Sequence, residues 1–267
     1  MNRPGKFSKG VVVQLSNQQR ITLTIEGNVL PRVLTVEEIY PFEVGEGVRL
    51  SANFHAFSYI GRGEEAEECV VLYNDSDNDA TFGLRPRRSS GMLRVKAPEI
   101  VKAHSTATIT LGYKIAKESN YYGALDDVLN IVVNGKESRT LLSTHAIAVD
   151  KYNPAIDDML VPSCELSKKI IKFGDVKHGK TAEASTIEIH NDSEADLLVR
   201  AVEWRSSALQ CSLKAGDRIA AGASCRVTFT LDTGECDYGV WVERVSIITN
   251  DVERPMQSVR VTAIVVD

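Results

Sequence analysis

Residues 238–250 read Tyr-Gly-Val-Trp-Val-Glu-Arg-Val-Ser-Ile-Ile-Thr-Asn, which is an aromatic-glycine step, an alternating apolar run and an Asn turn. Residues 122–134 follow the same pattern without a gap. A second apolar run comes after each, at 259–265 and at 141–147. Apolar residues that alternate with a period of two are typical of half-buried β-strands. The chain therefore contains the same closing pair of strands twice.

The closing pair occurs a third time near the start of the chain. Phe7, the apolar run 11–15, the turn Asn17 and the run 21–25 follow in the same order, but no front half precedes them. We therefore predict that residues 1–32 are the C-terminal hairpin of a truncated preceding domain. Two strands alone are marginally stable in water. The hairpin thus needs further structure to pack against. Three alternatives are open: residues upstream of this chain, the first full domain, or strands of another molecule.

Two complete copies of one domain pattern share their motifs in the same order. Each has an opening motif in which Phe and then Val are followed by a closing glycine, one residue shorter in the first copy, and then an Asn-Asp-Ser turn, a Thr-rich strand and the closing pair. The matched motifs are 42–47 with 173–179 and 74–76 with 191–193. A repeat that keeps its order over this length indicates tandem domains. Many short strands between turn clusters indicate β-sandwiches.

Connector-like segments divide these copies. Pro31 precedes the first copy, and the acidic, proline-containing segment 151–158 follows it; both suit exposed linkers. We predict an all-β chain of tandem immunoglobulin-like antiparallel β-sandwiches at residues 33–150 and 165–267, joined by a linker at 151–164.

With the motifs aligned in this way, the first copy differs from the second by one long stretch. Gly47 and Asn74 lie 27 residues apart, whereas Gly179 and Asn191 lie 12 apart, an excess of 15 residues. We therefore predict a 15-residue insertion in the first copy.

This stretch contains the candidate binding residues. Taken as one strand, residues 48–60 place His55, Phe57 and Tyr59 on the face that should meet solvent. Exposed aromatic side chains beside Arg62 predict a contact surface for a protein or a sugar. The alternative is that the aromatic side chains pack on a neighbouring domain.

Composition excludes several classes of function. With 43% apolar residues, 25% charged residues and a net charge of -5 in 267 residues, the chain has the profile of a soluble globular protein. The charge predicts no nucleic-acid partner. Since no run approaches about 18 apolar residues, we predict no direct membrane insertion. Residues 1–5 lack the apolar core of a signal peptide.

Cysteine and histidine spacing predicts no metal site and no other cofactor. None of the five cysteines forms a C-x-x-C pair, and no Cys/His set has zinc spacing. Cys211 and Cys225 lie on runs that can pair across residues 214–223, so a disulfide is one hypothesis and two half-buried thiols are the other. No catalytic motif is present, and we predict a protein that is not an enzyme.

Several motifs carry a family resemblance. They are Phe-Gly-Asp-Val-x-x-Gly at 173–179, the Asn-x-Ser turn, the Gly-x-Ser before a Thr-rich strand, and the closing Tyr-Gly strand. Together they resemble the immunoglobulin-like domain of unknown function 1573, which occurs, commonly in tandem, in secreted or periplasmic proteins of Gram-negative Bacteroidota. The resemblance covers 165–267 well and 33–150 more loosely. It implies the fold and a periplasmic, cell-surface or secreted location, but it brings no catalytic residues.

The preferred hypothesis is therefore a non-enzymatic, extracytoplasmic spacer or scaffold with a protein partner in the cell envelope. The first alternative is a carbohydrate-binding module that uses Phe57 and Tyr59. The second is a hydrolase whose carboxylates are dispersed in the sequence.

Overall fold

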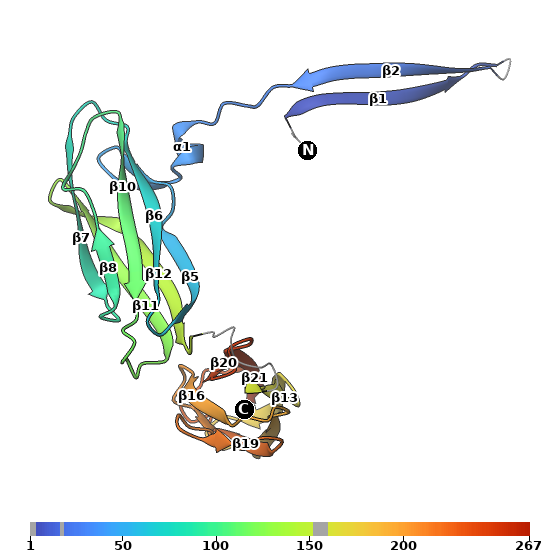
Figure 1. The fold of residues 1–267 in the computed structure, drawn as a ribbon, viewed down its shortest axis with the longest axis vertical. Coiled ribbons are helices and arrows are strands. Elements are labelled where there is room, and N and C mark those ends of the chain that lie inside the picture. Colours follow the sequence, from blue (N-terminus) through green and yellow to red (C-terminus); the bar gives the residue numbers. More distant parts are fainter. Residues whose placement is uncertain (1–3, 17–18, 152–159) are drawn as a thin grey trace.

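The computed structural model describes residues 4–16, 19–151 and 160–267, and these are almost entirely β-structure. Along the chain, a hairpin comes first, a short helix α1 (Val36–Ile39) follows, and two β-sandwiches come after it (Figure 1). The predicted all-β fold of tandem immunoglobulin-like sandwiches is confirmed. The turn Asn17 and residues 152–159 of the predicted linker lie outside the described residues.

The first sandwich packs two five-stranded sheets face to face. Its strands are β3 (Phe42–Gly45), β4 (Val48–Leu50), β5 (Phe54–Gly61), β6 (Glu65–Asn74), β7 (Ala80–Arg88), β8 (Leu93–Lys96), β9 (Ile100–Val101), β10 (Ser105–Lys114), β11 (Gly123–Val133) and β12 (Lys136–Val149). The strand orders are β3-β4-β6-β10-β8 and β5-β12-β11-β7-β9. Alternate side chains such as Leu111, Ile131 and Leu142 fill the space between the sheets.

The second sandwich has a four-stranded and a five-stranded sheet. Its strands are β13 (Glu165–Leu166), β14 (Ile170–Lys177), β15 (Ser185–His190), β16 (Leu197–Glu203), β17 (Leu209–Cys211), β18 (Arg218–Ile219), β19 (Ser224–Leu231), β20 (Gly239–Thr249) and β21 (Met256–Val266). The orders are β13-β15-β19-β17 and β14-β21-β20-β16-β18. Phe229, Val245 and Val261 lie in its core.

One edge pair in each sandwich departs from the expected antiparallel pairing. β5 runs parallel to β12, and β14 runs parallel to β21. Both parallel pairs contain a bulge, because Ser58 (φ 62°) and Gly174 (φ 72°) interrupt the register with the neighbouring strand. β5 and β14 are therefore the same strand of the repeated fold.

This correspondence corrects the alignment of the two copies. Phe57-Ser58-Tyr59-Ile60 in β5 occupies the place of Phe-Gly-Asp-Val at 173–176 in β14, and Gly63 then matches Gly179. The motif at 42–47 instead forms β3 and its turn, an added strand at the edge of the other sheet. The prediction of a 15-residue insertion is therefore wrong. The extra length lies before β4 rather than inside the repeat.

The N-terminal hairpin repeats the closing pair without a sandwich around it. β1 (Gly5–Gln14) and β2 (Arg20–Val29) pair only with each other among the described residues, and the hairpin projects away from both sandwiches (Figure 1). Gly5 opens β1 as Gly123 opens β11 and Gly239 opens β20, and all three have φ between 104° and 126°. The structure thus does not place the hairpin on the first sandwich, which was one of the three predicted complements.

One face of this hairpin is apolar along most of its length. In the antiparallel register every second residue points to the same side. The exposed apolar residues on that side are Phe7, Val11, Val13, Ile21, Leu23 and Ile25. Lys9 is the polar exception. It occupies the place of Asp127 in β11 and Glu243 in β20, when the strands are matched at their first glycine.

Candidate functional site

The four predicted binding residues do not form one exposed surface. β4 and β5 belong to opposite sheets, so residues 48–60 are not one strand. The bulge at Ser58 also exchanges the faces of β5, because an extra residue reverses the alternation. Phe57 consequently turns inward, where its ring lies 5.1 Å from that of Tyr113 and 4.9 Å from that of His55. The predicted exposure of Phe57 is therefore wrong.

Tyr59 and Arg62 have separate surroundings. Tyr59, which follows the bulge, points to solvent and is 44% exposed. Arg62 lies in the turn after β5, and its Nη1 donates to the Tyr122 hydroxyl at 2.6 Å. Tyr122 belongs to the junction between the sandwiches, so the structure assigns Arg62 to that junction.

Of the two hypotheses for Cys211 and Cys225, the disulfide is wrong and the pair of half-buried thiols agrees with the structure. Cys211 lies opposite Phe229 of β19, whereas Cys225 occupies a position four residues earlier in the same strand. At about 3.4 Å per residue the offset is roughly 13 Å, and bridged Cα atoms lie within about 7 Å. Both residues are half-buried free thiols, and burial raises the pKa of each.

The junction between the sandwiches contains a polar cluster around Tyr122. Arg200 of the second sandwich binds Asp150 of the first through Nε at 2.6 Å and Nη2 at 3.3 Å. The Arg200 guanidinium also lies 4.9 Å from the centre of the Tyr122 ring. The Tyr122 hydroxyl donates to Asp150 at 2.9 Å. Burial and this hydrogen bond raise the pKa of Tyr122, so the phenol stays neutral and can donate.

Glu203 makes the second polar contact of the junction. Its carboxylate accepts the N–H of Ala124, with oxygens at 3.1 and 3.2 Å. Gly123 permits this approach, since a Cβ there would lie 2.1 Å from Glu203 Oε1. Burial raises the pKa of Glu203, with the nearby Asp126 carboxylate adding to the effect.

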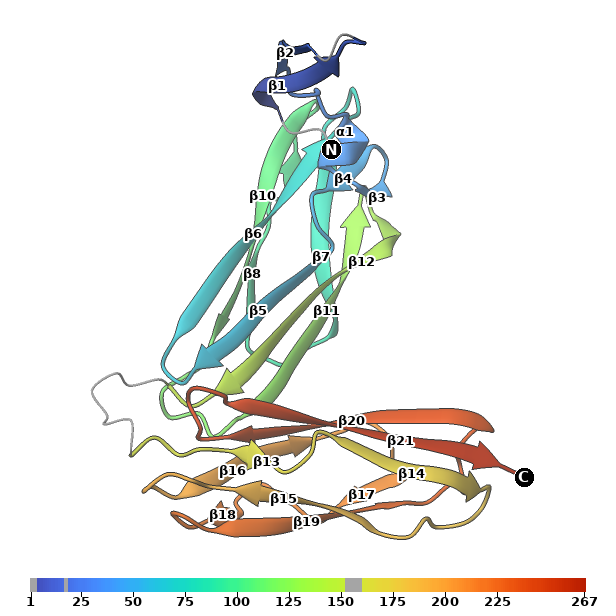
Figure 2. The same cartoon turned by 90° about the vertical axis from the view of Figure 1, so that its right-hand side faces the viewer.

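Apolar side chains close the remainder of the junction. Ile147 and Val149 at the end of β12 pack against Ala201 and Ile248 of the second sandwich. Each of the four is at most 9% exposed. Figure 2 shows the first sandwich standing with one end on the outer face of β20 and β21. The second sandwich is therefore attached by side-chain packing as well as by the linker.

An open groove of about 810 Å³ lies beside this contact. Asp126 and His145 of the first sandwich line one side, 2.7 Å apart between Oδ1 and Nδ1. Glu203, Trp204 and Arg244 of the second sandwich line the other. The Trp204 Nε1–H donates to the backbone at 3.0 Å. Apart from Arg244, these groups bind one another or the backbone, so we assign them to the architecture of the junction.

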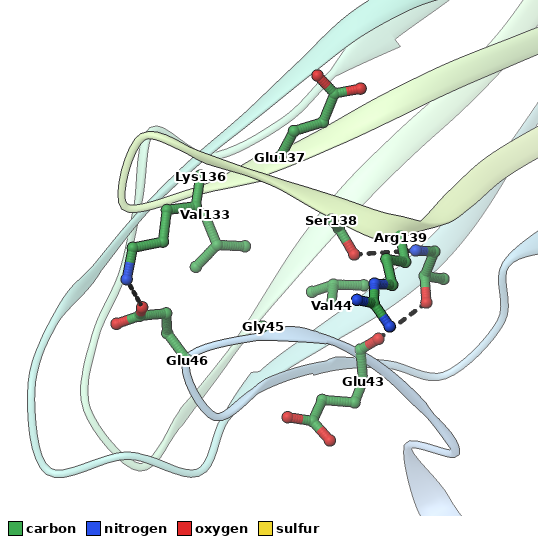
Figure 3. Close-up of a pocket in the computed structure, with 10 residues that line it drawn as sticks. Glu43, Val44, Gly45, Glu46, Val133, Lys136, Glu137, Ser138 and Arg139 are labelled. Carbon is green, nitrogen blue, oxygen red and sulfur yellow. Dashed lines mark hydrogen bonds and ion pairs between the residues drawn. The ribbon is translucent and has the colours of Figure 1, made fainter.

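A smaller depression of about 500 Å³ lies between β3 with its turn and the start of β12 in the first sandwich (Figure 3). The Lys136 ammonium binds the Glu46 carboxylate at 2.6 Å across it. Thr140 Oγ1 donates to the carbonyl of Glu43 at 2.9 Å, which ties β12 to β3. These contacts hold the added edge strand in place.

Sequence reasoning missed Arg200 and Glu203. In β16, Val199 pairs with Thr249 and Ala201 pairs with Ile248, so Arg200 is the extra residue of a β-bulge. The matching strand β7 has no residue inserted at that point. The only signal in the sequence is the one extra residue in β16 relative to β7. An extra residue of this kind forms a bulge, and a bulge re-aims the side chains beside it.

Over the described ranges, no helix is long and apolar enough to cross a membrane. Within the same ranges, no group of three or more His, Cys, Asp or Glu side chains is placed to hold a metal ion.

Comparison with known proteins yields solved structures only. No family model and no curated protein matches the sequence. A protein of unknown function from Porphyromonas gingivalis W83 is 18% identical, with a TM-score of 0.56 over 82% of this chain and 100% of its own. The PapD-like domain 7 of human CEP192 is 15% identical, with a TM-score of 0.35 over 44% of this chain and 94% of its own. The likeness to the Porphyromonas protein is one of fold.

Proposed function

We propose that this chain is a non-enzymatic scaffold that acts outside the cytoplasm, in the periplasm or at the cell surface. The observation that carries the proposal is the junction. Two ionic or polar contacts and an apolar cluster hold one end of the first sandwich on a sheet face of the second. Such a contact keeps whatever each sandwich binds at a fixed separation. The resemblance of residues 165–267 to the domain of unknown function 1573 supports the location.

The hairpin supplies the contact with a protein partner in this proposal. Its apolar face is exposed, and monomeric soluble proteins rarely leave such a face open. Both edges of the hairpin also present unpaired backbone groups, which favours strand addition by another polypeptide. A sugar ligand would not satisfy the apolar face, so we prefer a protein.

Site-specific photo-crosslinking in the native envelope tests this function. A photoreactive phenylalanine analogue replaces Leu23 on the apolar face or, as the matched control, Thr22 on the opposite face of the same strand. We expect a cross-linked protein from position 23 and little from position 22. Equal yields from both positions, or none from either, would contradict the assignment of the hairpin to a partner.

The fixed junction has its own test. Residual dipolar couplings of the full chain should fit one alignment tensor for both sandwiches. Two unrelated tensors would show that the sandwiches tumble independently, and the spacer function would then be wrong.

A further inference from the structure

The far end of the second sandwich repeats the surface on which the first sandwich holds the second. In the first sandwich, Ala124 pairs with Ile147 across β11 and β12. In the second sandwich, Val240 pairs with Ile264 across β20 and β21. The residues before and after these pairs match as well: Tyr122 with Tyr238, Gly123 with Gly239, Val149 with Val266, and Asp150 with Asp267. We call the second set the distal end.

The turn that contacts Tyr122 at the junction has a counterpart that contacts Tyr238 at the distal end. Arg62 follows β5 and donates to Tyr122, while His178 follows β14 and stacks on Tyr238 with ring centres 4.8 Å apart. The backbone N–H groups of Arg62 and His178 donate to the last residues of β12 and β21, at 3.2 and 2.8 Å. The distal end therefore has the backbone geometry of the junction as well as its residue types.

The two surfaces differ in what covers them. Ile147 is 8% exposed at the junction, whereas Ile264 is 45% exposed at the distal end. Val240 and Tyr238 are 78% and 63% exposed. Glu203 fills the space over Gly123, but nothing lies within 4 Å of a Cβ built on Gly239. An apolar hollow of about 260 Å³ lies between Val240, Ile264 and the bulge residue Gly174.

We propose that the distal end docks a third immunoglobulin-like sandwich, seated as the second is seated on the first. Its strand would present arginine and glutamate with the spacing of Arg200 and Glu203. The Asp267 carboxylate and the Tyr238 ring receive the arginine, and the N–H of Val240 receives the carboxylate. An apolar side chain in the place of Ile248 covers Ile264. This proposal names the partner of the scaffold and rests on the proposed function.

Charge and strand register exclude the sandwiches and the hairpin of this chain as partners of the distal end. The second sandwich of another copy already uses its Arg200 face in its own junction. The first sandwich has Arg85 where Glu203 lies. The bulged arginine of β7, Arg87, follows that place by two residues, whereas Arg200 precedes Glu203 by three, so β7 does not present the required spacing. The hairpin carries three cations in its described strands and only Glu26 as an acid, so it cannot supply the arginine-glutamate pair in the required spacing.

A chain extended after Asp267 by a second copy of residues 151–267 tests the proposal. The appended sandwich brings its own Arg200 and Glu203 counterparts to the distal end. Hydrogen exchange is measured at the Val240 amide, with the Ala124 amide as the internal reference. We expect exchange at Val240 to slow at least tenfold relative to the 267-residue chain. Ile264→Asp should abolish this protection, whereas Ile170→Asp, also exposed on the same sheet, should keep it.

Each other result overturns the proposal in an identifiable way. If Ala124 is protected and Val240 is not, the docking inference fails and the scaffold function stands. If neither amide is protected, the junction itself is absent and both fail. Protection of Val240 in the unextended chain that disappears on dilution would assign the distal end to a second copy. Protection that survives Ile264→Asp would show that the distal end is not the contact.

Discussion

Gly123→Ala should uncouple the two sandwiches. The new Cβ would lie 2.1 Å from Glu203 Oε1, so the carboxylate must swing away and release the N–H of Ala124. A hydrogen bond to a charged group contributes about 1.5–3 kcal/mol. A side chain at the φ of 113° adds strain of about 1–3 kcal/mol, which is unrelated to the contact.

Gly239→Ala is the matched control. Gly239 holds the same place in the second sandwich, with φ 104°, and nothing lies within 4 Å of its Cβ. The variant therefore carries the strain without the displaced carboxylate. Each alanine variant is made in the wild type and in the Glu203→Ala background. The comparison separates the backbone strain from the loss of the Glu203 hydrogen bond.

Urea unfolding followed by tryptophan fluorescence provides the measurement. Trp204 and Trp241 are the two tryptophans of the chain, and both lie in the second sandwich, so the signal reports on its stability. We expect Gly123→Ala to cost about 1.5–3 kcal/mol more in the wild type than beside Glu203→Ala. Gly239→Ala should cost the same in both backgrounds within about 0.5 kcal/mol. If Gly123→Ala costs the same in both, the Glu203 contact does not couple the sandwiches.

Three further predictions concern other features of the chain. Burial raises the pKa of Glu203 in the folded state, so the extra stability that comes from its protonation is fully present below its ordinary value of 4.5 and is lost as pH rises through the folded pKa; a plot of unfolding free energy against pH should be flatter for Glu203→Gln, and parallel plots would contradict this. Lysine at Val11 or Leu23 should change the unfolding free energy of neither sandwich, because the hairpin is exposed, and a change above about 0.5 kcal/mol would show that the hairpin packs on one of them. Thiol titration of the oxidised, urea-unfolded chain should find Cys211 and Cys225 both reactive, and a mass lower by two hydrogens in the peptides containing them would refute the register of β17 and β19.

The closing pair was predictable because its two complete copies align without a gap. Alternation of apolar residues from Tyr122 and from Tyr238 gave the strands, their inner faces and the tandem fold. The glycine that opens the first strand of each closing pair, Gly123 or Gly239, has the same place and positive φ as Gly5 of the hairpin. Repetition therefore revealed elements that propensity alone would have left ambiguous.

Bulges explain most of what the sequence did not reveal. A serine with positive φ at position 58 has no distinctive pattern, yet it reverses the face of Phe57. Phe42 resembled Phe173 in its motif, and the true counterpart lay 15 residues later at Phe57. The candidate binding surface failed for this reason. The junction was missed because Arg200 has no counterpart in the other copy to draw attention to it.

The bulge at Arg200 also bears on how such chains can diversify. Arg200, which forms the ion pair with Asp150, is an additional residue in β16 and does not replace a residue of the regular strand. Deletion of that residue would give β16 the regular register that β7 has at the matching point. The Arg200–Asp150 ion pair would then be lost, whereas the Glu203 contact and the apolar cluster of the junction involve other residues. A gain or loss of one residue thus adds or removes one of the contacts that hold two neighbouring sandwiches together.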